Sequence, residues 1–115
     1  MSKKILICDE DEKVRVSLKM NLGDHYELII VDSGAQAMHV LNNSKDISVA
    51  LFDIKLQKEL LTEVKASHPA LKIIMVTGYK SVETTVASSK RNISGYIVKP
   101  FKSEEILEIV RNNLK

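Results

Sequence analysis

The chain has few of the residues that most often reveal a function: among 115 residues there are no tryptophans, two phenylalanines, three tyrosines and one cysteine. The single cysteine, Cys8, excludes an internal disulfide and favours a reducing compartment. No apolar run approaches the roughly 18 residues that a membrane span requires. Basic residues number 17 and acidic residues 15. Because the basic residues are scattered and aromatics are few, the composition gives no sign of a nucleic-acid-binding surface.

The length and the apolar content predict one globular domain over residues 1–115, since 44% hydrophobic residues suffice for one moderate core. The first residues, MSKKILIC, enter a strand-like run too early to form a signal peptide. We therefore expect a cytoplasmic protein that does not insert into a membrane.

Strand-like and helix-like patterns alternate along the chain. The strand-like runs are short and rich in Ile and Val: KKILIC (3–8), YELIIV (26–31), SVALF (48–52), KIIMV (72–76) and GYIV (95–98). Between and after them, apolar residues recur at helical spacing, in groups that begin at Val14, Ala37, Leu60, Val82 and Ile106. Strand–helix units of this length predict a parallel sheet with right-handed crossovers and Cys8 in its core.

Local signals predict where some of these helices begin and end. Ser33 followed by Gln36 matches a capping box and predicts a helix from Gly34. Ser103 precedes two glutamates and is expected to cap the last helix. Pro69 restricts the residue before it and should end the third helix.

Candidate site residues lie at the carboxyl ends of four of the predicted strands. Asp9 and Glu10 follow the first strand, Asp53 the third, Thr77 the fourth and Lys99 the fifth. If the strand order is 2-1-3-4-5, they converge at the edge where open α/β sheets bind ligands. Taken alone, each has a structural explanation, for example Asp53 as a helix cap or a strand-end polar residue. Together they supply acids, a hydroxyl and a fixed cation at one edge.

The segments KKILICDEDEKVR, VALFDIKL, KIIMVTGY and GYIVKPF occur in an order and spacing that resembles the receiver domain of two-component response regulators. The resemblance covers the whole chain. It implies a flavodoxin-like (βα)₅ fold, with a parallel five-stranded sheet of order 2-1-3-4-5 between two layers of helices. It also implies a bacterial signalling protein rather than an enzyme, which accepts a phosphoryl group from a sensor histidine kinase or phosphotransfer protein.

The resemblance assigns a role to each matching residue. Asp53 is the implied phosphoacceptor, and it shares a Mg²⁺ (or Mn²⁺) ion with Asp9, Glu10 and the backbone carbonyl of Lys55. A carboxylate attacks an anionic phosphoryl group poorly, and a hard cation with oxygen ligands neutralises and aligns the two.

Three further residues complete the implied switch. Thr77 is expected to bond the phosphoryl group after transfer, Lys99 to pair first with Asp53 and then with the phosphate, and Tyr96 to turn inward when Thr77 moves. The implied output surface is the helix 4–strand 5–helix 5 face, which contacts an effector domain or protein, with no direct nucleic-acid contact by this domain.

Two departures from the family pattern leave alternatives open. Glu10 stands where the family more often has Asp, and the loop after Asp53, IKLQKELL, lacks Pro and Gly and is about four residues short. The short loop requires the third helix to begin soon after Gln57, and it favours a degenerate receiver that binds partners without phosphorylation. A flavodoxin-like FMN protein or an aspartyl phosphohydrolase is a further alternative, although the acidic segment CDEDEK would repel an unassisted phosphate.

Overall fold

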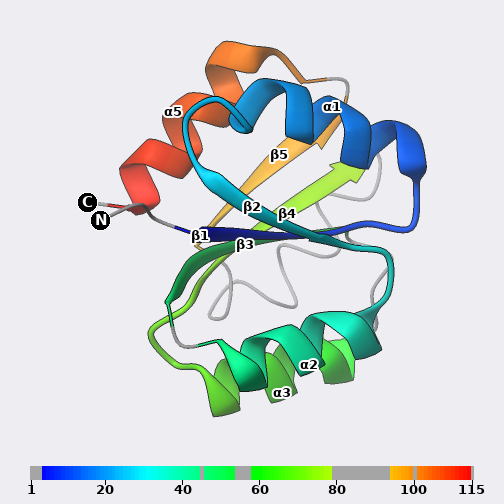
Figure 1. Cartoon of the computed structure of the whole chain (residues 1–115), viewed down its shortest axis with the longest axis vertical. Coiled ribbons are helices and arrows are strands. Elements are labelled where there is room, and N and C mark those ends of the chain that lie inside the picture. Colours follow the sequence, from blue (N-terminus) through cyan, green and yellow to red (C-terminus); the bar gives the residue numbers. More distant parts are fainter. Residues whose placement is uncertain (1–3, 45, 54–57, 79–93, 100, 115) are drawn as a thin grey trace.

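The chain folds into a parallel five-stranded sheet between two layers of helices (Figure 1), with strand order β2-β1-β3-β4-β5. This computed structural model describes residues 4–44, 46–53, 58–78, 94–99 and 101–114. The flavodoxin-like class and the strand order predicted from the sequence are both confirmed. Every strand pair in the sheet is parallel, as short strand–helix–strand connections require.

The strands occupy the predicted segments, but several extend further at the carboxyl end. They are β1 Lys4–Cys8, β2 Glu27–Val31, β3 Ile47–Asp53, β4 Lys72–Gly78 and β5 Gly95–Lys99. The sequence placed Asp53, Thr77 and Lys99 just past their strands, whereas each is a residue of its strand. The reason is pairing: Asp53 is in register with Val76, and Thr77 with Val98, so the ladder continues through these positions.

Helices cover both faces of the sheet. They are α1 Glu12–Leu22, α2 Gly34–Asn43, α3 Lys58–Ser67 and α5 Ser103–Asn113. Helices α1 and α5 lie on one face, and α2 and α3 lie on the other (Figure 1). The helix predicted from Val82 falls in segment 79–93, outside the described residues. No helix in the described ranges is long and apolar enough to cross a membrane.

The helix-end predictions are confirmed except at Ser103. The Ser33 side chain accepts a hydrogen bond from the Gln36 amide at 3.3 Å and caps α2, as predicted. Helix α3 begins at Lys58 and ends before Pro69. Ser103, by contrast, is the first residue of α5 and not its cap. Its hydroxyl donates instead to the Asn21 side-chain oxygen on α1, so a contact between helices replaces the local cap.

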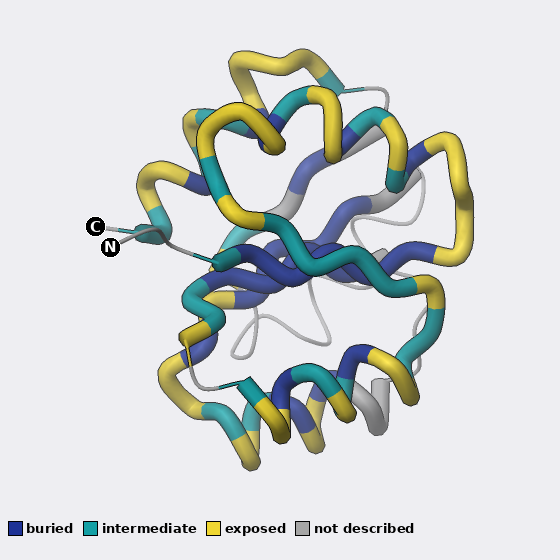
Figure 2. Tube along the Cα trace, in the orientation of Figure 1, coloured by how far each residue is buried: buried dark blue, intermediate teal, exposed yellow. Residues whose placement is uncertain are grey.

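Two hydrophobic cores lie on either side of the sheet, and the described parts of β1, β3 and β4 are largely buried between them (Figure 2). Val14, Leu18 and Leu22 of α1 pack with Ile106 and Val110 of α5 on one face. Residues of α2 and α3 pack on the other, together with the fully buried Phe52 and with Cys8, which is buried as predicted. Burial on both faces explains the continuous apolar runs of these strands.

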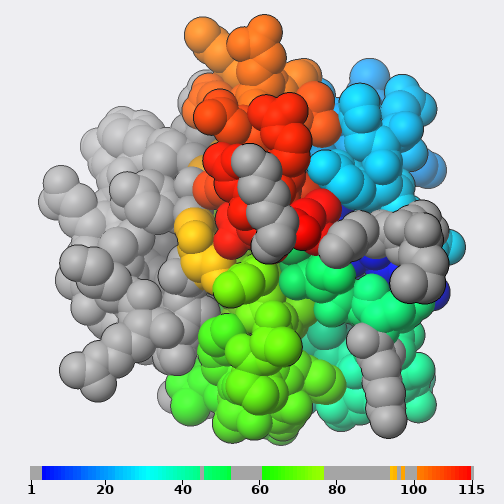
Figure 3. Space-filling view, turned by 90° about the vertical axis from the view of Figure 1, so that its left-hand side faces the viewer, coloured from blue at the N-terminus to red at the C-terminus, as the bar shows by residue number. Residues whose placement is uncertain are grey.

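The amino-terminal edge of the sheet carries polar contacts unrelated to the predicted site. Figure 3 looks at this edge, where the end of α5 lies close to the segment that leads out of α3. A cavity of about 450 Å³ lies here, lined by residues that include Leu41, His68 and Leu114. Lys4 pairs with Asp46 at 2.8 Å, and this hydrogen-bonded ion pair raises the pKa of Lys4 and lowers the pKa of Asp46.

Candidate functional site at the carboxyl ends of the strands

Sheet register brings most of the predicted site positions to one edge of the molecule. Cys8, immediately before Asp9, pairs with Phe52, immediately before Asp53. On the other side of β3, β4 carries Thr77 and pairs with β5 so that Gly78 is opposite Lys99. The backbones of β1, β3, β4 and β5 therefore end side by side, as the sequence predicted.

The structure describes only part of this predicted set. The side chains of Asp53, Thr77, Tyr96 and Lys99 lie outside the described residues, as does the whole of Lys55. Tyr96 is placed by its backbone in β5, in register with Met75. The assigned roles of these five residues therefore stay predictions.

The acidic loop after β1 is described in full and is held by short local bonds. Asp9 is 2% exposed, and its amide donates to the Val31 carbonyl of β2 at 3.3 Å. Its Oδ1 atom accepts from the Asp11 amide at 2.8 Å. The Asp11 side chain in turn accepts from the Lys13 amide at 2.9 Å and caps α1. Glu10, between the two, is exposed, so the loop buries one carboxylate and presents the next.

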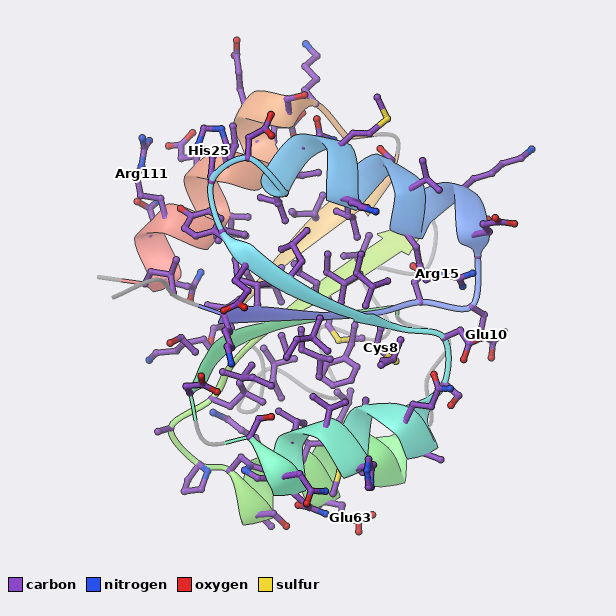
Figure 4. All side chains as sticks on the ribbon, in the orientation of Figure 1. Cys8, Glu10, Arg15, His25, Glu63 and Arg111 are labelled. Atoms are coloured by element: carbon purple, nitrogen blue, oxygen red, sulfur yellow. The ribbon has the colours of Figure 1, made fainter. Side chains whose placement is uncertain are left out.

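Arg15 on α1 contacts the backbone of this loop and was not among the residues predicted from the sequence. From the first turns of α1, its Nη1 atom donates to the carbonyl oxygen of Asp9 at 2.7 Å and of Glu10 at 3.0 Å. Figure 4 shows Arg15 and Glu10 at the same edge of the sheet, where β1 ends. The signal that could have found it is its position, six residues after Asp9 and directly after Val14, where the predicted helical pattern begins.

The donor chemistry of the loop fits a hard divalent cation. Asp9 and Glu10 offer carboxylate oxygens, which are the protein ligands that Mg²⁺ prefers alongside water. Thiol and imidazole ligands favour softer metals, and the predicted set contains neither. Among the side chains that the structure describes, which do not include that of Asp53, no three acidic, histidine or cysteine groups gather at one point. The described acids therefore supply part of a cation site.

The sequence matches the family model of the response regulator receiver domain over residues 5–111. The chain belongs to this family. The receiver domain is thus part of two-component signalling, and receiver domains generally act as phosphoacceptors that bind Mg²⁺ at the phosphorylation site.

Individual relatives agree with the assignment. The receiver domain is 28% identical to the response regulator protein FleR of Pseudomonas aeruginosa, over 96% of this chain and 24% of that protein. Among solved structures, it resembles a CheY-like receiver domain protein from Methanospirillum hungatei, with 35% identity and a TM-score of 0.87 over 99% of this chain and 94% of that one.

The chain also resembles part of a larger protein, NtrX from Brucella abortus, with 28% identity and a TM-score of 0.90 over 99% of this chain and 26% of that one. The receiver domain thus spans about a quarter of the length of the first curated relatives.

Proposed function

We propose that this receiver domain accepts a phosphoryl group on Asp53 and thereby switches its binding to a partner. The observation that supports the proposal is the register of the sheet, in which Asp53 ends β3 between the acidic loop after β1 and the ends of β4 and β5. We further propose that residues 1–115 form one such domain, that it acts in the cytoplasm, and that it turns over no separate substrate.

The proposed transfer is a displacement at phosphorus. A carboxylate oxygen of Asp53 forms the new O–P bond while the N–P bond of a donor phosphohistidine breaks. The leaving imidazole keeps the bonding pair and takes up a proton. The product is an acyl phosphate, a mixed anhydride that water later cleaves, which returns the Asp53 carboxylate and releases inorganic phosphate. The residues around Asp53 need only position and stabilise charge.

Asp9, Glu10, Asp53 and the Lys55 carbonyl would hold a divalent cation, Mg²⁺ or Mn²⁺. When bound, the cation neutralises charge on the carboxylate and on the phosphoryl oxygens. Lys99 provides a second, fixed positive charge where negative charge develops. The Thr77 hydroxyl then donates a hydrogen bond to a phosphoryl oxygen. These roles account for the residue types found at this edge.

The proposed output is a population shift. Phosphate contacts with Thr77 and Lys99 favour a state in which Tyr96 turns inward, and the equilibrium moves by the difference in those contacts between the two states. The phosphoryl donor is a sensor histidine kinase or phosphotransfer protein. The receiving partner is an effector domain or protein that contacts the helix 4–strand 5–helix 5 face.

The function is tested by incubating the protein with phosphoramidate and Mg²⁺ and measuring its intact mass. The expected result is a gain of one phosphoryl group, which chelation of the metal prevents. Asp53→Ala should abolish the gain. Asp32→Ala is the matched control, because Asp32 is an exposed acid that follows β2 at the same edge, and it should be phosphorylated like the wild type.

The same measurement distinguishes this proposal from a degenerate receiver, the alternative that the short loop after Asp53 favours. A degenerate receiver would keep the fold and bind partners, but would gain no mass at any metal concentration. Equal phosphorylation of wild type and Asp53→Ala would instead place the reaction at another residue. Either result would overturn the proposal.

A further inference from the structure

A single guanidinium nitrogen fixes both peptide groups of the acidic loop. Arg15 Nη1 lies 2.7 Å from the carbonyl oxygen of Asp9 and 3.0 Å from that of Glu10. The nitrogen carries two N–H groups, so each carbonyl can take one of them. Because two consecutive carbonyls point at the same atom, the orientation of the peptide planes after Asp9 and Glu10 is set from α1.

We infer that Arg15 is a positioning residue for the divalent cation, acting through the backbone carbonyls of Asp9 and Glu10; this inference rests on the proposed function. Its side chain is half-buried, and charge-assisted bonds of this kind are stronger than neutral ones. Fixing the two peptides fixes the directions in which both carboxylates leave the backbone. Outer contacts that orient ligands in this way commonly control metal affinity.

The choice of acceptors is what makes Arg15 suitable for this role. Its Nη1 atom bonds the carbonyl oxygens of Asp9 and Glu10. The guanidinium therefore contacts the backbone of the loop, from which the two carboxylates extend. The Asp11 amide bond to Asp9 Oδ1 and the Asp11 cap of α1 hold the same loop from its other end.

Two effects of Arg15 on a bound cation have opposite signs. Its permanent positive charge repels a cation, so removing the charge alone should tighten binding. Loss of the two carbonyl bonds frees the loop and should weaken binding. We expect positioning to dominate, because an outer-shell change typically costs about 10–100-fold in metal affinity, whereas water and salt screen part of the charge of a half-buried side chain.

The test is a Mg²⁺ titration of the metal-free protein, followed by the amide shifts of Asp11 and Lys13 in ¹H–¹⁵N spectra. Arg15→Ala should raise the Kd by about tenfold, the lower end of the range for such contacts. Lys13→Ala is the matched control: it removes an equal charge from an exposed side chain two residues earlier on α1. It should leave the Kd unchanged or lower it by about twofold or less. Arg15→Lys keeps charge and one donor atom, and should fall between wild type and Arg15→Ala.

Amide hydrogen exchange without metal gives a second measurement. Exchange of the Asp11 amide should be faster in Arg15→Ala than in wild type or Lys13→Ala, because the loop that holds its acceptor is looser. Unchanged or tighter Mg²⁺ binding by Arg15→Ala would overturn the role of Arg15 while leaving the proposed function intact. A wild-type protein that binds no Mg²⁺ would remove the proposed metal site itself, and with it any role for Arg15.

Discussion

Two neighbouring acids of the site differ in their surroundings. Asp9 is buried and bonded through its own Oδ1 to the Asp11 amide, whereas Glu10 is exposed. The receiver resemblance implied a cation site at these two residues, and carboxylates are ligands that such ions take. Which of the two is buried could not be predicted, since it depends on Arg15 and on the Val31 carbonyl of a strand distant in sequence.

Asp53 should destabilise the metal-free fold, because it adds a third carboxylate to Asp9 and Glu10 and like charges repel. We expect Asp53→Ala to raise the melting temperature without metal and to shrink the Mg²⁺ increment. At a Mg²⁺ concentration ten times the Kd, the wild type should gain about 1.4 kcal/mol in free energy of unfolding. For a domain of this size that gain raises the melting temperature by several degrees. Thermal melts with and without Mg²⁺ measure both.

The matched control for these melts is Asp24→Ala, an exposed acid between α1 and β2, which should change neither quantity. If Asp53 is only a helix cap or strand-end acceptor, its loss should cost about 1 kcal/mol with or without metal. A lower metal-free stability of Asp53→Ala together with an unchanged Mg²⁺ increment would therefore contradict the metal-site assignment.

The lifetime of the phosphorylated state is expected to depend on Lys55 and Tyr79, both outside the described residues. Each lies two positions after a proposed site residue, Asp53 or Thr77, and both are bulky and poorly suited to orient an attacking water. Lys55→Asn with Tyr79→Glu should speed phosphate loss, followed as the decay of the phosphorylated mass. Lys72→Asn, at the opposite edge, is the charge control. Equal decay rates in all three proteins would remove this prediction.

At the scale of whole elements, local sequence signals succeeded where the cap is local and failed where a distant helix competes. Ser33 bonds the Gln36 amide within its own helix, as its spacing predicts. Ser103 has an equally suitable sequence, but its hydroxyl bonds Asn21, 82 residues away on α1. Propensity cannot anticipate a partner supplied by tertiary packing.

The packing of α5 on β5 leaves little room for a side chain at Gly95. A Cβ atom there would lie 2.7 Å from Ile109 Cδ1. Gly95→Ala should therefore lower the free energy of unfolding by about 1–3 kcal/mol, as overpacking does. Ile109→Val deletes the Cδ1 atom and should by itself lower the free energy of unfolding by about 0.5–1.5 kcal/mol. The double variant should lose less than the sum, as measured by denaturant unfolding. Strict additivity would show that the contact is not the cause.

The end of α3 should give stability a dependence on alkaline pH. Lys65 Nζ donates to the carbonyls of Pro69 and Leu71 at 3.1 and 2.8 Å. Burial, and then the charge of Lys72, lower the pKa of Lys65 below its usual 10.5. Its protonated form is thus less favourable in the folded state, and this penalty is relieved as pH rises through the folded pKa toward 10.5.

Lys65→Met removes the titration, so wild type should gain stability relative to this variant as the pH approaches 10.5. Denaturant unfolding of both proteins at neutral pH and near pH 10.5 measures the gain. Since Lys65 is only partly buried, solvent screening keeps the gain small. A constant difference between the two proteins across this range would contradict the burial of Lys65.

At the scale of the whole molecule, the alternation of strands and helices predicted a parallel sheet, and the receiver resemblance supplied the strand order that the structure confirms. Periodicity identified the elements, and short crossovers allow only parallel pairing. The extension of β3 and β4 through Asp53 and Thr77 was not predicted, because polar residues at a strand end carry no apolar signal. Register, a property of two strands together, decides their extent.

The proposed switch couples the site to the output face across the domain. Phosphorylation should shift backbone amide resonances throughout residues 77–110, since Thr77 lies on β4 and Tyr96 on β5, adjacent in the sheet. Spectra of the protein before and after phosphoramidate treatment measure the spread, with Asp53→Ala as the unmodified control. Shifts confined to the neighbourhood of Asp53 would show that no relay reaches this face.

The central claim is that Asp53, of all the acids at this edge, becomes the acyl phosphate. Borohydride reduces an acyl phosphate to a primary alcohol, which converts the modified aspartate to homoserine. Protein treated with phosphoramidate and Mg²⁺, then reduced and digested, is mapped by peptide mass. We predict homoserine at position 53 alone, and none when the metal is chelated. Homoserine at position 9 or 11, or at none of the aspartates, would contradict the assignment.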